Sequence, residues 1–146
     1  MKLFTIGFTQ KSAQEFFELL RQNGVQRLVD IRFNPKGQLA GFTKQEDLPY
    51  FLDQLAAGCR YVYMPVLAPT KEIRDAFRNG GDRQVYVSCF EKLMDERDIP
   101  ASLDREEFSQ FPTCLLCSEP TPEHCHRRLI AERLAKYWQD LEIVHL

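Results

Sequence analysis

Residues 3–31, LFTIGFTQKSAQEFFELLRQNGVQRLVDI, contain the pattern that decides the fold. The apolar segments 3–6 and 27–31 are typical of strands buried on both faces, because neither alternates cleanly between apolar and polar residues. Between them, Ser12 and Glu15 have the spacing of a helix capping box and precede an apolar helical face. Strand, helix and strand in this order predict a βαβ unit with parallel strands and a right-handed crossover.

The rest of the chain continues the alternation of strands and helices. Residues 33–45 are predicted to form a loop. We expect a single α/β domain over residues 1–146, a three-layer sandwich in which a mostly parallel sheet of about five strands has helices on both faces. The further strands are predicted at 61–64, 113–117 and 142–146, and the further helices at 46–56, 70–80, 86–97 and 122–138.

The composition is typical of a globular protein, with 44% hydrophobic and 27% charged residues. Nineteen basic and twenty-one acidic residues leave a net charge of −2, which excludes a generally basic surface for nucleic acid or membranes. No signal peptide precedes the five cysteines, so we expect reduced thiols and a cytoplasmic protein. No apolar run approaches the roughly 18 residues of a membrane span.

Unusual polar residues follow the predicted strands at the ends where open parallel sheets bind ligands. They follow the first two strands, and they recur between the 113–117 strand and the start of the last helix. We therefore expect them to gather at one edge of the sheet. The predicted site residues are Gly7, Thr9, Asp30, Arg32, Cys117, Glu119, Cys125, His126 and Arg127.

The last helix is expected to begin with Thr121 as its N-cap and Pro122 in its first turn. His126 would then face the sheet, where it can reach the strand ends or act as a core histidine bonded to a backbone carbonyl. At about 100° per residue, the sheet-facing side is predicted to hold His126, Ile130, Arg133, Leu134 and Tyr137.

The cysteines near this helix allow several kinds of chemistry. Cys125 in the first turn is expected to have a lowered pKa, because the helix dipole and Arg127 favour a thiolate; alternatively it is a small apolar filler. Cys114 and Cys117 have the spacing of a zinc pair, but residues three apart on a strand point to opposite faces. Geometry still allows Cys117 to bind zinc with Cys125 or His126. We predict no metal or cofactor and keep zinc as the alternative.

A local basic mouth could form on this acidic protein from Arg32, Lys36, Arg127 and Arg128. Backbone N–H groups at the start of the last helix would add to an anion site. Arg32 is equally consistent with a clamp for phosphate or carboxylate and with a salt bridge to Asp30 or Glu119. The chain has no Walker loop, G-x-G-x-x-G fingerprint or G-x-S-x-G elbow.

Four segments resemble the DUF488 family, whose function is unknown. They are residues 5–9 (TIGFT), 28–32 (LVDIR), 115–127 (LLCSEPTPEHCHR) and 144–146 (VHL). The resemblance implies that the site lies among the polar residues of the second and third segments. Two departures are visible, since the family frequently has histidine at Phe8 and a Gly-Gly pair where this chain has residues 67–70 (LAPT).

The leading functional hypothesis is an enzyme-like site for a small anionic ligand, either phosphate-bearing or nucleotide-like. Its ligand-binding residues would be Arg32 and Arg127, with Gly7, Thr9 and Cys117. The catalytic candidates are His126, Glu119, Asp30 and Cys125. The alternatives are a non-catalytic module that binds nucleic acid, a thiol or metal protein using Cys117 and Cys125, and a purely structural polar network.

Overall fold

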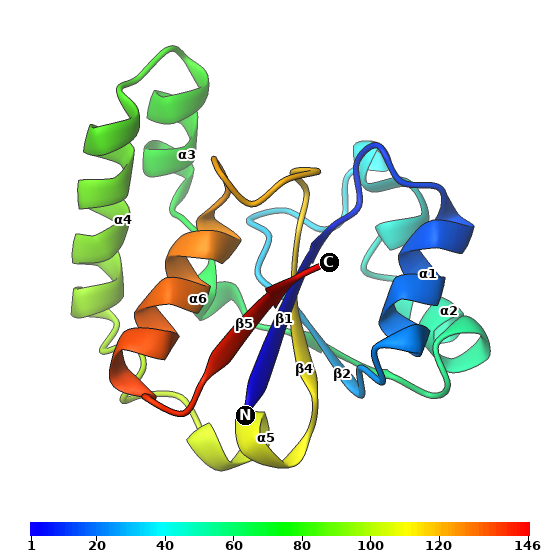
Figure 1. Ribbon diagram of the computed structural model, residues 1–146. Coiled ribbons are helices and arrows are strands. Elements are labelled where there is room, and N and C mark those ends of the chain that lie inside the picture. Colours follow the sequence, from blue (N-terminus) through cyan, green and yellow to red (C-terminus); the bar gives the residue numbers. More distant parts are fainter.

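The computed structural model describes residues 1–146, and its centre is a sheet of five parallel strands in the order β3-β2-β4-β1-β5 (Figure 1). The sheet predicted as mostly parallel is therefore wholly parallel. All strands end at the same edge, where Gly7 pairs with Cys117 and Asp30 with Leu116. The strands are β1 (Lys2–Gly7), β2 (Arg27–Asp30), β3 (Arg60–Tyr63), β4 (Thr113–Cys117) and β5 (Glu142–His145).

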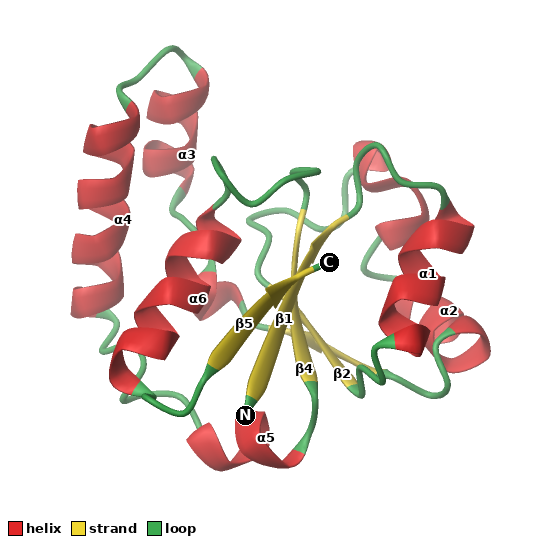
Figure 2. Cartoon of the chain, viewed as in Figure 1, coloured by secondary structure: helices red, strands yellow, loops and turns green.

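Helices cover both faces of the sheet, which confirms the predicted three-layer sandwich (Figure 2). One face carries α1 (Ala13–Gln22) and α2 (Leu48–Leu55). The opposite face carries α4 (Arg83–Glu96) and α6 (His126–Tyr137), and α3 (Lys71–Arg78) packs beside α4. The short α5 (Arg105–Gln110) lies near the start of β4. None of these helices combines the length and apolar character that crossing a bilayer requires.

Two hydrophobic clusters separate along the strands, because successive side chains point to opposite faces. Leu28, Cys114 and Leu116 pack under α1 and α2, whereas Val29 and Leu115 pack under α4 and α6. All five side chains are fully buried. Burial on both faces explains why the strand segments are apolar without alternation. It also separates Cys114 from Cys117, so these two cannot form a zinc pair.

The start of α6 was predicted wrongly. The helix begins at His126 with Cys125 as its N-cap, and not at Pro122 with Thr121 as the cap. The Cys125 N–H donates to the Pro122 carbonyl in a turn, so residues 118–125 cross the carboxyl edge as a loop. This loop brings the N-cap residue directly over the end of β4.

Other local expectations also need correction. Tyr137 was expected to face the sheet, but it is 56% exposed. Arg133, also expected on the sheet-facing side, points to the neighbouring helix α4, where its guanidinium reaches Glu91 and Asp95. The helix α5 and a 3₁₀ segment at Gln38–Thr43, inside the predicted loop, were both missed.

Half of the predicted capping box at the start of α1 is present. The Ser12 hydroxyl accepts a hydrogen bond from the Glu15 N–H at 3.0 Å, but the Glu15 carboxylate does not return a bond to Ser12. Replacing Ser12 with alanine should lower the free energy of unfolding by about 1 kcal/mol in urea denaturation, because one helix N–H loses its acceptor. Ser12→Asp keeps an acceptor and should remain near wild type; an equal loss in both variants would contradict the role of the cap.

Candidate functional site

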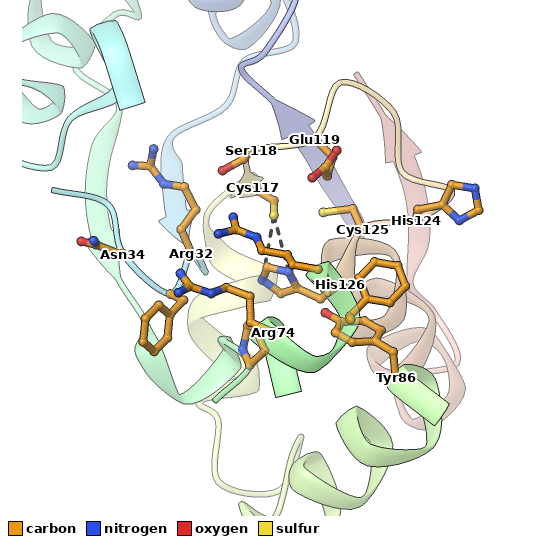
Figure 3. A pocket seen from close by; sticks show the side chains of 14 residues that line it. Arg32, Asn34, Arg74, Tyr86, Cys117, Ser118, Glu119, His124, Cys125 and His126 are labelled. Atoms are coloured by element: carbon orange, nitrogen blue, oxygen red, sulfur yellow. Dashed lines mark hydrogen bonds between the residues drawn. The ribbon is translucent and has the colours of Figure 1, made fainter. Parts of the chain in front are cut away.

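A cavity of about 380 Å³ opens at the carboxyl edge of the sheet (Figure 3). Its walls come from the ends of β2 and β4, the loop after β4, the start of α6, and the helices α3 and α4. Of the nine predicted site residues, the cavity is lined by Arg32, Cys117, Glu119, Cys125 and His126. The cavity therefore lies at the edge where open parallel sheets bind ligands.

Two thiols and an imidazole form a buried cluster on the cavity wall. Cys117 ends β4, while Cys125 caps α6 and His126 begins it, so the loop after β4 determines their contact. Their sulfur and ring nitrogen atoms all lie within 4.8 Å of one another. The exposed fractions are only 5%, 2% and 7% in the same order. Figure 3 shows the two sulfurs directed toward each other above the His126 ring.

Hydrogen bonds assign the tautomer of His126. Its Nε2 lies 2.7 Å from the carbonyl oxygen of Ile31, and because a carbonyl only accepts, Nε2 must carry the proton. The other nitrogen, Nδ1, lies 3.5 Å from Cys117 Sγ. The hydrogen bond from Nε2 to Ile31, directly after β2, fixes the orientation of the ring and leaves Nδ1 as the atom available to the cysteines.

The two thiols have opposite pKa shifts. The hydrogen bond with Cys125 lowers the pKa of the Cys117 thiol and outweighs the opposing effect of burial. The nearby backbone N–H groups of Ser118 and Glu119 act in the same direction. Burial, with the hydrogen bond to Cys117, raises the pKa of the Cys125 thiol. Of the two alternatives considered for Cys125, the raised pKa and the 2% exposure favour a buried, neutral thiol over a thiolate.

Arg32 and Asp30 form a buried ion pair beside the cavity. The Nε and Nη2 groups of Arg32 each donate to one carboxylate oxygen of Asp30 at 2.8 Å. Arg32 also donates to the hydroxyl and the carbonyl of Thr43, and Tyr61 donates its hydroxyl to Asp30 at 2.6 Å. Figure 3 shows the guanidinium of Arg32 directed away from Cys117. Most of its donors are thus committed to the protein.

The remaining predicted residues position the loop after β4. Thr9 donates through its hydroxyl to the Ser118 carbonyl at 2.6 Å. Arg127 is fully buried and donates through Nη1 to the Glu119 carbonyl, while its Nε and Nη2 have no partner. Gly7 lies so close to the Glu119 carbonyl that a β-carbon there would overlap it. These three residues, like Asp30, do not line the cavity.

Two arginines of α3 were missed by the sequence analysis. Arg74 and Arg78 both line the cavity, and their four-residue spacing puts them on the same side of the helix. Arg74 lies 4.2 Å above the Phe33 ring and is paired with Asp75 at 3.2 Å. Arg78 is exposed and has no ion-pair partner. The four-residue spacing was the available signal, but nothing in it indicated that α3 would face the end of β4.

The other residues of the expected basic mouth lie elsewhere. Lys36 is exposed and lines a separate hollow with Lys44, and Arg128 pairs with Glu132 at 2.7 Å. Glu119 is exposed and is one of the residues that line the cavity. Phe8, where the family frequently has histidine, is buried in the core and packs against Phe42.

Comparison with known proteins agrees with the resemblance seen in the sequence. The family model described as "Domain of unknown function DUF488" matches residues 12–134, which include both thiols and the imidazole of the cluster. Neither the search of curated proteins nor that of solved structures found a match. Because the family model covers most of the chain, the protein belongs to the DUF488 family.

Proposed function

We propose that this protein is an enzyme that binds a small ligand carrying a phosphate-like anionic group in the cavity at the carboxyl edge. The observation that carries the proposal is that two arginines and a buried thiol–imidazole cluster line the same cavity of about 380 Å³. That volume suits a metabolite-sized ligand. We further propose that it acts in the cytoplasm, where its five free cysteines would remain reduced.

Arg74 and Arg78 are the proposed anion clamp, in place of Arg32 and Arg127. A guanidinium that is already saturated by buried partners has few donors left for a ligand, which is the situation of Arg32. Arg74 and Arg78 approach the cavity from α3 and retain free donors, because the only bonds from either are those of Arg74 to Asp75. Bidentate contacts from such side chains are well suited to phosphate.

Two groups are proposed to take part in the reaction of the bound ligand: the Glu119 carboxylate and the thiol–imidazole cluster. Glu119 is an exposed residue of the cavity lining, and its carboxylate is the candidate general acid or base. The cluster of Cys117, Cys125 and His126 is the second proposed reactive group and lines the same cavity as the two arginines. Asp30 supports the site indirectly, by holding Arg32 and the end of β2.

The test is a thermal-shift panel with inorganic phosphate, pyrophosphate, mononucleotides and oligonucleotides of increasing length. At least one small anion should stabilise the wild type at millimolar concentration. The double variant Arg74→Ala/Arg78→Ala should bind that anion at least about tenfold more weakly, which corresponds to roughly 1.4 kcal/mol. A matched double variant, Arg21→Ala/Lys92→Ala, removes the same charge from exposed positions outside the cavity and should bind normally.

Three outcomes would count against the proposal. If none of the small anions stabilised the wild type, or if an anion stabilised both double variants equally, the proposed anion site would be contradicted. Affinity that grows with oligonucleotide length and falls steeply with salt would favour the nucleic-acid module instead, because each added phosphate contact releases counterions.

A further inference from the structure

We infer that Cys117, Cys125 and His126 form a zinc site with three protein ligands and one open position facing the cavity. The three protein ligands of the zinc ion are inferred from the geometry of their side chains. Only the identity of the small molecule that would take the open position rests on the proposed function.

The distances fit a tetrahedral zinc ion. With Zn–S bonds of about 2.3 Å and Zn–N bonds of about 2.0 Å, a sulfur and a nitrogen ligand lie about 3.5 Å apart, and two sulfur ligands about 3.8 Å apart. Cys117 Sγ and His126 Nδ1 are 3.5 Å apart, and all three ligand atoms lie within 4.8 Å of one another. One ion can therefore bridge all three groups with small side-chain adjustments.

The surroundings of His126 match those of a metal-ligating histidine. Such residues donate their second ring N–H to a carboxylate or a backbone carbonyl, which sets the tautomer and the ring orientation. His126 makes this contact from Nε2 to Ile31 at 2.7 Å, and its Nδ1 is left for the ion. Phe90 also packs against the His126 ring, with 5.7 Å between the ring centroids, and restricts its rotation.

Charge balance also favours a divalent cation. Two thiols that both ionise on binding supply two negative charges, which neutralise one zinc ion in a buried site. Without a cation, two sulfurs this close cannot both be ionised without strong repulsion. The choice of zinc follows from the donors, because thiolate and imidazole ligands in a tetrahedral arrangement suit zinc better than magnesium or calcium.

The fourth position distinguishes this site from a structural zinc site. Structural sites are closed by four protein ligands, whereas catalytic sites have three and leave one position for water or substrate. Only three metal-binding side chains meet here, and all three line the cavity that Arg74 and Arg78 also line. An oxygen of the anionic ligand could therefore occupy the open position while the arginines hold its remaining charge.

The first measurement is the metal content of untagged protein, reduced with a non-chelating phosphine, loaded with zinc and desalted. We expect about one zinc per chain in the wild type and at least about tenfold less in Cys117→Ser and Cys125→Ser. Cys89→Ser and His124→Asn are the controls, since Cys89 is exposed and outside the cluster and His124 lines the cavity without joining it. Wild-type protein without zinc, or unchanged content in the two ligand variants, would overturn the site.

Cobalt replaces zinc in a second measurement, which needs no variant and is therefore unaffected if the substitutions impair folding. Wild-type protein with Co²⁺ should show near-ultraviolet thiolate-to-metal charge transfer and the strong visible bands of tetrahedral coordination. Their absence would overturn the inference. Added inorganic phosphate should alter the visible bands, and an unchanged spectrum at saturation would overturn the role given to the open position.

The zinc site and the anion site can fail separately. Zinc binding without anion binding would support the zinc site and contradict the proposed function. Anion binding that depends on Arg74 and Arg78, in a protein that retains no zinc, would support the proposed function and contradict the zinc site.

Discussion

Replacing Arg32 with methionine should lower the free energy of unfolding by about 3–5 kcal/mol, because it leaves a buried carboxylate without its counterion. Asp30 is fully buried and Arg32 is 4% exposed, and two bonds of 2.8 Å join them. Methionine preserves much of the side-chain volume, so the loss reports mainly on charge and hydrogen bonding. Urea denaturation followed by circular dichroism measures it.

Two further variants distinguish the stability lost with the ion pair from the general effect of a substitution. Tyr61→Phe removes one hydrogen bond to the Asp30 carboxylate and should cost less, about 1.5–3 kcal/mol. Arg105→Ala breaks the exposed pair with Asp140 and should leave the urea midpoint unchanged. A loss below about 1 kcal/mol in Arg32→Met would contradict the role given to the buried pair.

The same variant also tests how Arg32 relates to the ligand. If Arg32 is mainly structural, folded Arg32→Met protein should keep most of its affinity for the anion, measured below its unfolding transition. If folded Arg32→Met protein lost as much anion affinity as Arg74→Ala/Arg78→Ala, Arg32 would have to be counted among the residues that bind the anion.

Apart from α5, the order of strands and main helices could be predicted from the sequence, because the central strands are short apolar runs with recognisable helix signals beside them. Leu28 and Val29 illustrate this, since neighbouring residues are buried on opposite faces and produce a run without alternation. The start of α6 could not be predicted in the same way. Thr121 and Pro122 have the local preferences of a helix start, but the loop carries the chain across β4 before the helix begins.

The candidate site was predictable in part for a similar reason. Cys117 and His126 could be placed at the carboxyl edge because strand ends and helix starts meet there. Their contact depends on the path of the loop between them, and the contribution of α3 depends on how that helix packs beside α4. Arg74 and Arg78 were missed because local periodicity gives the side of a helix but not the element that it faces.

Replacing Gly7 with alanine should lower the free energy of unfolding by about 3 kcal/mol, the upper part of the range for overpacking. A β-carbon at Gly7 would lie 1.6 Å from the Glu119 carbonyl oxygen and 2.6 Å from Nη1 of Arg127. The nearest obstacle is backbone, so no change of rotamer can relieve the overlap. The loop after β4 or the end of β1 must move.

Gly37→Ala is the matched control, because a β-carbon there meets no atom within 4 Å and the φ angle of −66° suits alanine. It should remain within about 0.5 kcal/mol of wild type in urea denaturation. In Gly7→Ala, the displaced loop should also separate Cys117 from Cys125, which lie at its two ends. Because Ser118 and Glu119 of this loop line the cavity, its displacement should also make folded Gly7→Ala protein respond less to the anion than Gly37→Ala. If Gly7→Ala had the stability and the anion response of the wild type, the close approach of Gly7 to the Glu119 carbonyl would not be what positions this loop.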